Sequence, residues 1–81
     1  HYAPDAELRL NARAVEADEA LLAFGAPLKG AAVVENLSDT CDLKEAAANL
    51  FRMLRQLDAG GAKKIAVMPV PHEGLGVAIN D

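Results

Sequence analysis

The sequence predicts an α/β fold: a small two-layer or three-layer sandwich of Rossmann-like type, with about four mostly parallel strands, one long helix over residues 42–59 and a truncated C-terminal helix. Three observations predict it. Short apolar runs bounded by glycine or proline are typical of buried strands. A helical repeat of apolar residues fills the stretch 43–57. Strand, helix, strand and helix then follow one another in the second half, as in a crossover unit with parallel strands.

The N-terminal residues divide into a lead-in and a first strand. Residues 1–7 contain Pro4 and show no period, so we expect them to be a linker or lead-in, with the domain itself over 8–81. The run at 8–10 alternates apolar and polar residues, which predicts a short, half-buried strand. Residues 13–19 are polar and Ala-rich, and they are expected to form a helical turn or a loop.

Two further strands are expected on either side of a tight turn. Residues 20–24 form an apolar run, and residues 31–37 contain two consecutive valines. Between them, the segment 25–30 holds two glycines and a proline and predicts a turn. This turn is too short for a helix, so the two strands could form a hairpin. The sequence alone leaves that pairing open.

The clearest element is the helix that follows Asp42. Asp42 is a good N-cap, and Glu45 three residues later completes a capping-box-like pair. Arg52 and Arg55 lie toward the other end, where cations suit the helix dipole. Apolar residues at three- and four-residue steps predict one buried stripe, in which we expect Leu50, Phe51 and Leu54 to carry the core: Leu43, Ala46, Ala47, Leu50, Phe51, Leu54 and Leu57.

The chain after this helix predicts a cap, a strand and a second helix. Gly60-Gly61 offers a left-handed C-cap. Residues 65–68 are expected to form a fourth strand, which Pro69 and Pro71 stop. Residues 73–81 would begin the second helix.

The charge balance and the single cysteine restrict the class of protein. Twelve acidic residues face eight basic ones, for a formal net charge of −4, which argues against direct nucleic-acid binding. No apolar run approaches the roughly 20 residues of a membrane span. Cys41 has no partner for an internal disulfide and indicates a reducing, cytoplasmic setting. No histidine lies near it in sequence to act as a base, so we do not expect a nucleophile.

Two polar segments are candidates for chemistry. Ser38, Asp39 and Thr40 form a loop between an expected strand and the long helix, where ligands often bind in α/β sheets. We favour the plainer interpretation that these residues make turn hydrogen bonds. The adjacent acids Asp18 and Glu19 are expected to be a solvated surface pair.

The glycines near the C-terminus, Gly74 and Gly76, stand where a glycine-rich turn can bind phosphate. The segment lacks the third glycine of a dinucleotide motif and the Lys-Ser/Thr pair of a P-loop. Glu73 also places a negative charge where a phosphate would enter the turn. We therefore expect these glycines to serve turning and close packing. His72-Glu73 does not extend to a zinc motif because position 76 is glycine, so no metal site is expected.

The stretches HYAP at 1–4 and NLSDTCDLKEAAANLFRMLRQLDAGGAKKIAVMPVPHEGLGVAIND at 36–81 resemble the C-terminal domain of the two-domain L-threonylcarbamoyladenylate synthases, the longer relatives of the YrdC-like proteins. The resemblance covers most of the chain. In that family HYAP-like residues close the linker from the catalytic domain, so His1, Tyr2 and Pro4 would lie near the catalytic cleft. The chain departs from the family at Cys41, where glycine is expected, and it is shorter between 24 and 31.

The resemblance implies an accessory domain that positions the linker over a catalytic domain joined to it in cis. The parent would be a nucleotidyltransferase that converts threonine, bicarbonate and ATP into threonylcarbamoyl-AMP and pyrophosphate. A partner enzyme would pass the threonylcarbamoyl group to the adenosine beside the anticodon of tRNA. ATP, with or without Mg²⁺, would bind the YrdC-like domain, and this segment would hold no cofactor and no catalytic residue.

Two other functions stay open from the sequence. One is a standalone module that senses a nucleotide through the Ser38–Thr40 loop or the Gly74–Gly76 loop. The other is a docking module for the enzyme that modifies the tRNA.

Overall fold

The computed structural model describes residues 5–71, and the expected second helix over 73–81 lies outside this range. Four strands and one helix follow one another along the described chain. They are β1 (Glu7–Arg9), β2 (Ala20–Phe24), β3 (Val33–Ser38), α1 (Leu43–Ala59) and β4 (Lys64–Val67). Every expected strand is present, with ends shifted by one or two residues. The segment 13–19 is a loop.

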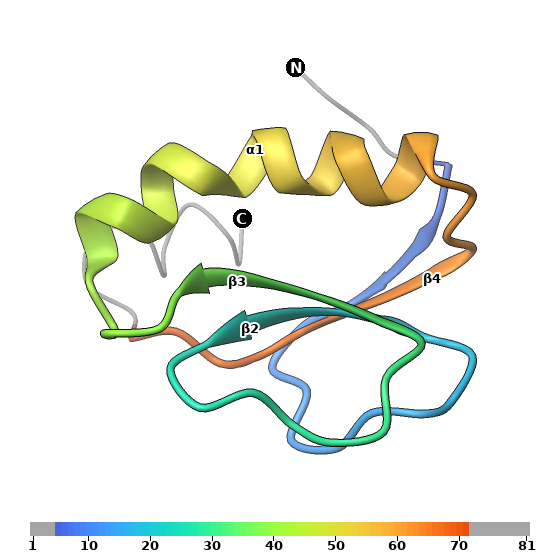
Figure 1. Cartoon of the computed structure of the whole chain (residues 1–81), viewed down its shortest axis with the longest axis horizontal. Helices are drawn as coiled ribbons and strands as arrows, with labels where there is room; N and C mark the ends of the chain where they lie inside the picture. Colours follow the sequence, from blue (N-terminus) through green and yellow to red (C-terminus); the bar gives the residue numbers. More distant parts are fainter. Residues whose placement is uncertain (1–4, 72–81) are drawn as a thin grey trace.

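The four strands form one sheet in the order β1-β4-β2-β3, and every neighbouring pair is parallel. β4 lies between β1 and β2, so strands from the two ends of the described chain are neighbours in the sheet. Figure 1 shows α1 running along one face as it connects β3 to β4. The predicted α/β fold is therefore confirmed, as a two-layer structure over the described residues.

The hairpin considered for residues 20–37 is wrong, because β2 and β3 are parallel. Their link over 25–32 runs back past the sheet without forming a helix. A chain in extended form covers about 3.3 Å per residue, so this short link is long enough to return past the five residues of β2. Positive φ angles at Gly25 (79°) and Gly30 (107°) allow the reversals.

The face of the sheet under α1 holds the larger hydrophobic core. Fully buried side chains of three strands, Leu22, Leu37 and Ile65, lie against the helix in this cluster. The helix contributes five buried residues to it: Ala46, Leu50, Met53, Leu54 and Leu57. Burial of this apolar area, at about 25 cal/mol per Å², is the main favourable term that holds α1 to the sheet.

Loops cover the opposite face of the sheet. Figure 1 shows the segments before β2 and before β3 on the side away from α1. Apolar residues of these loops and of the strands form a second, smaller cluster: Ala12, Val15, Leu21, Ala23, Leu28, Ala31, Ala66 and Met68. Both faces of the central strand β2 are therefore shielded from water, as its uniformly apolar sequence requires.

Both ends of α1 are capped, although the capping box is only half formed. The Asp42 carboxylate accepts the N–H groups of Lys44 and Glu45, as predicted. The Asp42 N–H donates to Ser38 Oγ at 2.8 Å, so the serine takes the place expected for the Glu45 side chain. At the other end, the N–H groups of Gly61 and Ala62 donate to the carbonyls of residues 58 and 57. With Gly61 at a φ of 92°, this is a Schellman cap.

The predicted stripe of α1 is wrong at Phe51, which is 54% exposed, and at Ala47, which is also exposed. Met53 is buried in their place. Successive residues of a helix are turned by about 100° around its axis. Leu50 lies at the centre of the buried stripe, so the next residue, Phe51, lies to one side of it.

The last turn of α1 also differs from the prediction. It contains no basic residue, because Arg52 and Arg55 both precede it, and it contains Asp58. A carboxylate there opposes the negative end of the helix dipole.

We expect Leu50→Ala to lower the free energy of unfolding by about 2–5 kcal/mol, because it leaves a cavity between α1 and the sheet. The neighbouring change Phe51→Ala removes a larger but exposed side chain, and should cost less than about 1 kcal/mol. Urea denaturation followed by circular dichroism measures both values. Equal losses for the two variants would show that the buried face of α1 is assigned wrongly.

Candidate functional site

The loop after β3 is closed by its own hydrogen bonds. Ser38 is 2% exposed, and its Oγ accepts the Asp42 N–H and lies 3.3 Å from Thr40 Oγ1. Asp39 and Thr40 are exposed. The structure thus brings the three candidate residues together in one turn that fastens β3 to α1, and turn hydrogen bonds account for the position of Ser38.

The N-terminus of α1, which faces this loop, is occupied by the side chain of Asp42. Its Oδ1 lies 2.9 Å from the N–H nitrogen of Lys44 and 3.4 Å from that of Glu45. A phosphate bound here would meet the carboxylate, and two like charges about 4 Å apart repel by roughly 4 kcal/mol near a protein surface. The Lys44 and Glu45 amides at this helix N-terminus are therefore already bound by a carboxylate and are not free for an anion.

Cys41 lies in the same turn, with an exposed free thiol and a φ of 61°. This left-handed conformation strains a residue that carries a Cβ atom and suits glycine. The structure therefore gives a physical reason for the glycine that the resemblance leads one to expect at this position.

Five other residues singled out in the sequence, His1, Tyr2, Pro4, Gly74 and Gly76, lie outside the described residues. Within residues 5–71, no three His, Cys, Asp or Glu side chains are grouped so that they could hold a metal ion. In the same range, α1 is the one helix, and no helix has the length and hydrophobicity needed to cross a membrane.

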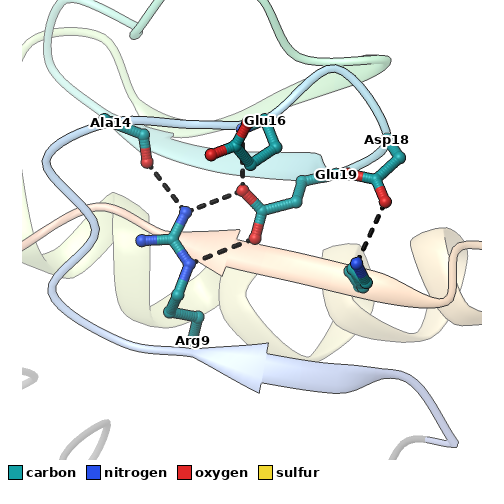
Figure 2. A network of polar contacts seen from close by, with 6 residues as sticks. Arg9, Ala14, Glu16, Asp18 and Glu19 are labelled. Atoms are coloured by element: carbon teal, nitrogen blue, oxygen red, sulfur yellow. Dashed lines mark hydrogen bonds and ion pairs between the residues drawn. The ribbon is translucent and has the colours of Figure 1, made fainter.

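An ion pair between Arg9, whose side chain is 48% exposed, and the buried Glu19 was not predicted. Figure 2 shows the Arg9 side chain reaching from β1 across β4 to Glu19, which directly precedes β2. Arg9 Nη2 lies 2.7 Å from Glu19 Oε1, and Arg9 Nε lies 3.1 Å from Oε2, so the contact is bidentate. Arg9 Nη2 also donates to the Ala14 carbonyl at 2.8 Å, and the Glu16 N–H donates to Glu19 Oε1 at 2.8 Å.

The prediction that Asp18 and Glu19 form a solvated pair is therefore wrong for Glu19, whose side chain is only 6% exposed. Asp18 is exposed, as predicted, and pairs with Lys64 at 3.0 Å. A surface pair of this kind contributes little to stability. The one sequence signal for the buried carboxylate is its place immediately before the wholly apolar β2.

The contacts of Glu19 change its protonation. The hydrogen bond from Arg9, followed by that from the Glu16 N–H, lowers the pKa of the Glu19 carboxyl below its ordinary value of 4.5 against the opposing effect of burial. The hydrogen bond to Asp18 raises the pKa of Lys64. The Glu19 carboxylate is thus stabilised as an anion that ties the loop before β2 to β1.

A hollow of about 540 Å³ lies at the amino ends of β2, β3 and β4, beside the last turn of α1. Ligands of α/β sheets usually bind at the opposite, carboxyl end. Its lining combines apolar residues and glycines with both signs of charge, as at Glu35 and Lys63. Among the described residues every buried side-chain polar atom has a hydrogen-bond partner, so none is left for a ligand in this hollow.

These observations define a small α/β domain with a parallel sheet. Its buried polar side chains, among the described residues, form hydrogen bonds that hold the loops and the helix to the sheet. The comparison with protein families agrees with this class. The family described as "Threonylcarbamoyl-AMP synthase, C-terminal domain" matches residues 1–81, and the chain belongs to this family. No curated protein and no solved structure gives a significant match.

We expect Cys41→Gly to be more stable than Cys41→Ala by about 0.5–1 kcal/mol. Both changes remove the thiol, but only glycine relieves the left-handed strain, part of which its greater unfolded-state entropy offsets. Thermal unfolding of the two variants side by side measures the difference. A glycine variant that melts no higher than the alanine variant would contradict the strain argument.

Acid should weaken the fold through Glu19. Because the folded-state pKa is lowered, the contribution of this carboxylate is present above its ordinary pKa of 4.5 and is lost as pH falls through the lower folded value. Glu19→Gln keeps the shape and removes this titration. We expect the wild-type free energy of unfolding to fall more steeply than that of Glu19→Gln from about pH 5 downward, as measured by urea denaturation.

Asp18→Asn is the matched control for that experiment, because it changes the neighbouring exposed carboxylate. It should retain the acid dependence of the wild type. If Glu19→Gln showed the same slope as the wild type, the titrating group would lie elsewhere.

Proposed function

We propose that this domain acts within a threonylcarbamoyl-AMP synthase as an accessory domain that holds the interdomain linker, at His1, Tyr2 and Pro4, over a YrdC-like catalytic domain. The observation that carries the proposal is the match of the whole of 1–81 to the C-terminal domain family of these synthases. The parent enzyme would convert threonine, bicarbonate and ATP into threonylcarbamoyl-AMP and pyrophosphate. ATP and any Mg²⁺ would bind the catalytic domain.

The charges of the described residues support a role without nucleotide binding. Among the described residues, the Asp42 N–H is bound by Ser38 and the Lys44 N–H by the Asp42 carboxylate, so these two amides are not free for a phosphate. The net charge of −4 is equally unsuited to tRNA. The tRNA would therefore meet a separate enzyme, which takes threonylcarbamoyl-AMP as its substrate in the cytoplasm.

The sequence enters the domain directly from the linker residues, and this supports the positioning role. Pro4 is two residues before Ala6, which is 7% exposed and belongs to the core under α1. The described chain is thus attached to the core from Ala6 onward, directly after the residues that the proposal assigns to the linker.

The test compares the full-length synthase with a form that lacks this domain and with a form that carries Tyr2→Ala. We expect both changed forms to lose kcat/KM in a pyrophosphate-release assay, since both retain the catalytic domain but lose its ordered linker. The isolated domain should give only background turnover. An unchanged kcat/KM in the form without the domain would contradict the proposal.

An amide NMR titration of the domain with ATP separates this function from nucleotide sensing. We expect no saturable shifts at Ser38–Asp42 or at Gly74 and Gly76. A localised, saturable response at either loop would favour the sensing function.

A further inference from the structure

The outer edge of β3 is open in the part of the chain that the structure describes. Within residues 5–71, β3 is the last strand of the sheet, and its one strand neighbour is β2. Val33 and Val34, which begin it, are 50% and 44% exposed. Edge strands are usually protected by a lysine, a proline or a bulge. The first half of β3 carries none of these, so this apolar edge is suited to the addition of another strand.

The backbone groups of Val34 point toward this open edge. The Leu22 carbonyl accepts the Met68 N–H on the β4 side, so the backbone groups of the preceding residue of β2, Leu21, face β3. In a parallel pair, such a residue bonds to the two neighbours of its register partner. The register partner of Leu21 is Val34. Leu21 therefore bonds to the neighbours of Val34, and the N–H and C=O of Val34 itself point outward.

The second half of the same edge is already closed. A register shift between Ala23 and Phe24 interrupts the regular pairing with β2 there. The Leu37 carbonyl accepts a hydrogen bond from the Asn49 side chain of α1 at 2.9 Å. The accessible part of the edge is thus short, and it is centred on Val34.

A second copy of the same strand fits this edge in one antiparallel register. With Val34 opposite Val34 of the second copy, the two residues exchange both of their backbone hydrogen bonds, and Val33 lies opposite Glu35. In the register centred on Glu35, two carboxylates would lie directly opposite each other, which is destabilising. In the register centred on Val33, Val34 would face Ala32, whose N–H already donates to the Glu19 carbonyl.

The hollow at the amino ends of the strands lies beside this register. Val33, Glu35 and Gln56 all contribute to its lining. The Glu35 side chain of the second copy, opposite Val33, would lie at the rim of this hollow, where the Gln56 amide can donate to a carboxylate. Lys63 adds a positive charge to the same lining. The pairing thus brings together polar as well as apolar groups, as in other protein interfaces.

We propose that the open edge of β3 joins two copies of this chain: β3 pairs antiparallel with β3 of a second copy about a two-fold axis at Val34, and the two four-stranded sheets become one. A two-fold contact of this kind closes on itself, because the same edge is used on both sides. The interface is small, so we expect a weak dimer that forms at micromolar concentrations or above. This association goes beyond the proposed function and does not depend on it.

The experiment uses the full-length protein that contains this chain, and sedimentation velocity over a range of concentrations measures its mass. We expect the mass to rise toward that of a dimer. Val34→Lys places two like charges at the axis and should weaken the association about tenfold or more. Leu8→Lys is the matched control, because Leu8 is an exposed apolar residue of the other edge strand, β1, and this variant should associate like the wild type. Circular dichroism confirms that both variants are folded.

Cysteine cross-linking tests the register independently of the affinity. Directly opposite residues lie within the Cα separation of about 4.4–6.8 Å that a disulfide allows. When every native cysteine, Cys41 included, is changed to serine, Val34→Cys should give a disulfide-linked dimer under mild oxidation. Val33→Cys should not, because the two copies of residue 33 would lie diagonally, about 7–8 Å apart.

Three results would overturn the proposal. A protein that remains monomeric at every concentration would leave this edge to a strand of another domain or of another protein. A dimer that Val34→Lys leaves intact would place the contact elsewhere on the molecule. Equal cross-linking of Val33→Cys and Val34→Cys would show that the strands meet without the proposed register.

Discussion

The parallel pairing of all four strands is the constraint on which the rest of this structure depends. Each parallel neighbour requires the chain to return to the same end of the sheet before the next strand begins. The described chain makes that return with a helix only once, through α1. The other returns are loops, and they have to supply the apolar cover of the second face themselves, which Ala12, Val15, Leu28 and Ala31 do.

This economy explains why a carboxylate is buried in so small a domain. The loop before β2 forms no helix or strand. The Ala12 N–H attaches its start to the Val67 carbonyl, and its end needs further attachments to stay on the sheet. Glu19 supplies them, because its two carboxylate oxygens accept hydrogen bonds from Arg9 of β1 and from the Glu16 N–H of the loop. A buried carboxylate without such partners would cost several kcal/mol. With them, it fixes the position of a segment that has little apolar area to bury.

The local signals of the sequence predicted the strands and the long helix well, because each of these elements depends mainly on residues that are close together in the sequence. Asp42 and Gly61 serve as caps at the expected places. The errors arose where distant segments decide the outcome. Phe51 fits the helical period as well as Leu50 does, and only the three-dimensional structure shows that its side chain is exposed. The parallel register of β2 and β3 likewise depends on a loop whose path no local motif specifies.

The candidate site was harder to predict for a related reason. The Ser38–Thr40 loop has the composition of a binding turn. The hydrogen bond from the Asp42 N–H to Ser38 Oγ, which closes this loop, is seen only in the three-dimensional structure. The Arg9–Glu19 pair joins β1 to the residue just before β2, across β4, so no spacing rule reveals it. The contacts that attach the loops of this domain to its sheet are thus a property of the three-dimensional arrangement.

The place of β1 beside β4 has a consequence for synthesis of the protein on the ribosome. The first strand of the domain finds its partner only in the last described one, with Glu7 opposite Lys64. Contacts that join such distant segments form late, since the whole intervening loop must be closed first. Proteins are made from the N-terminus, so β1 emerges from the ribosome long before β4. It therefore stays without its partner strand until residues 64–67 have been translated.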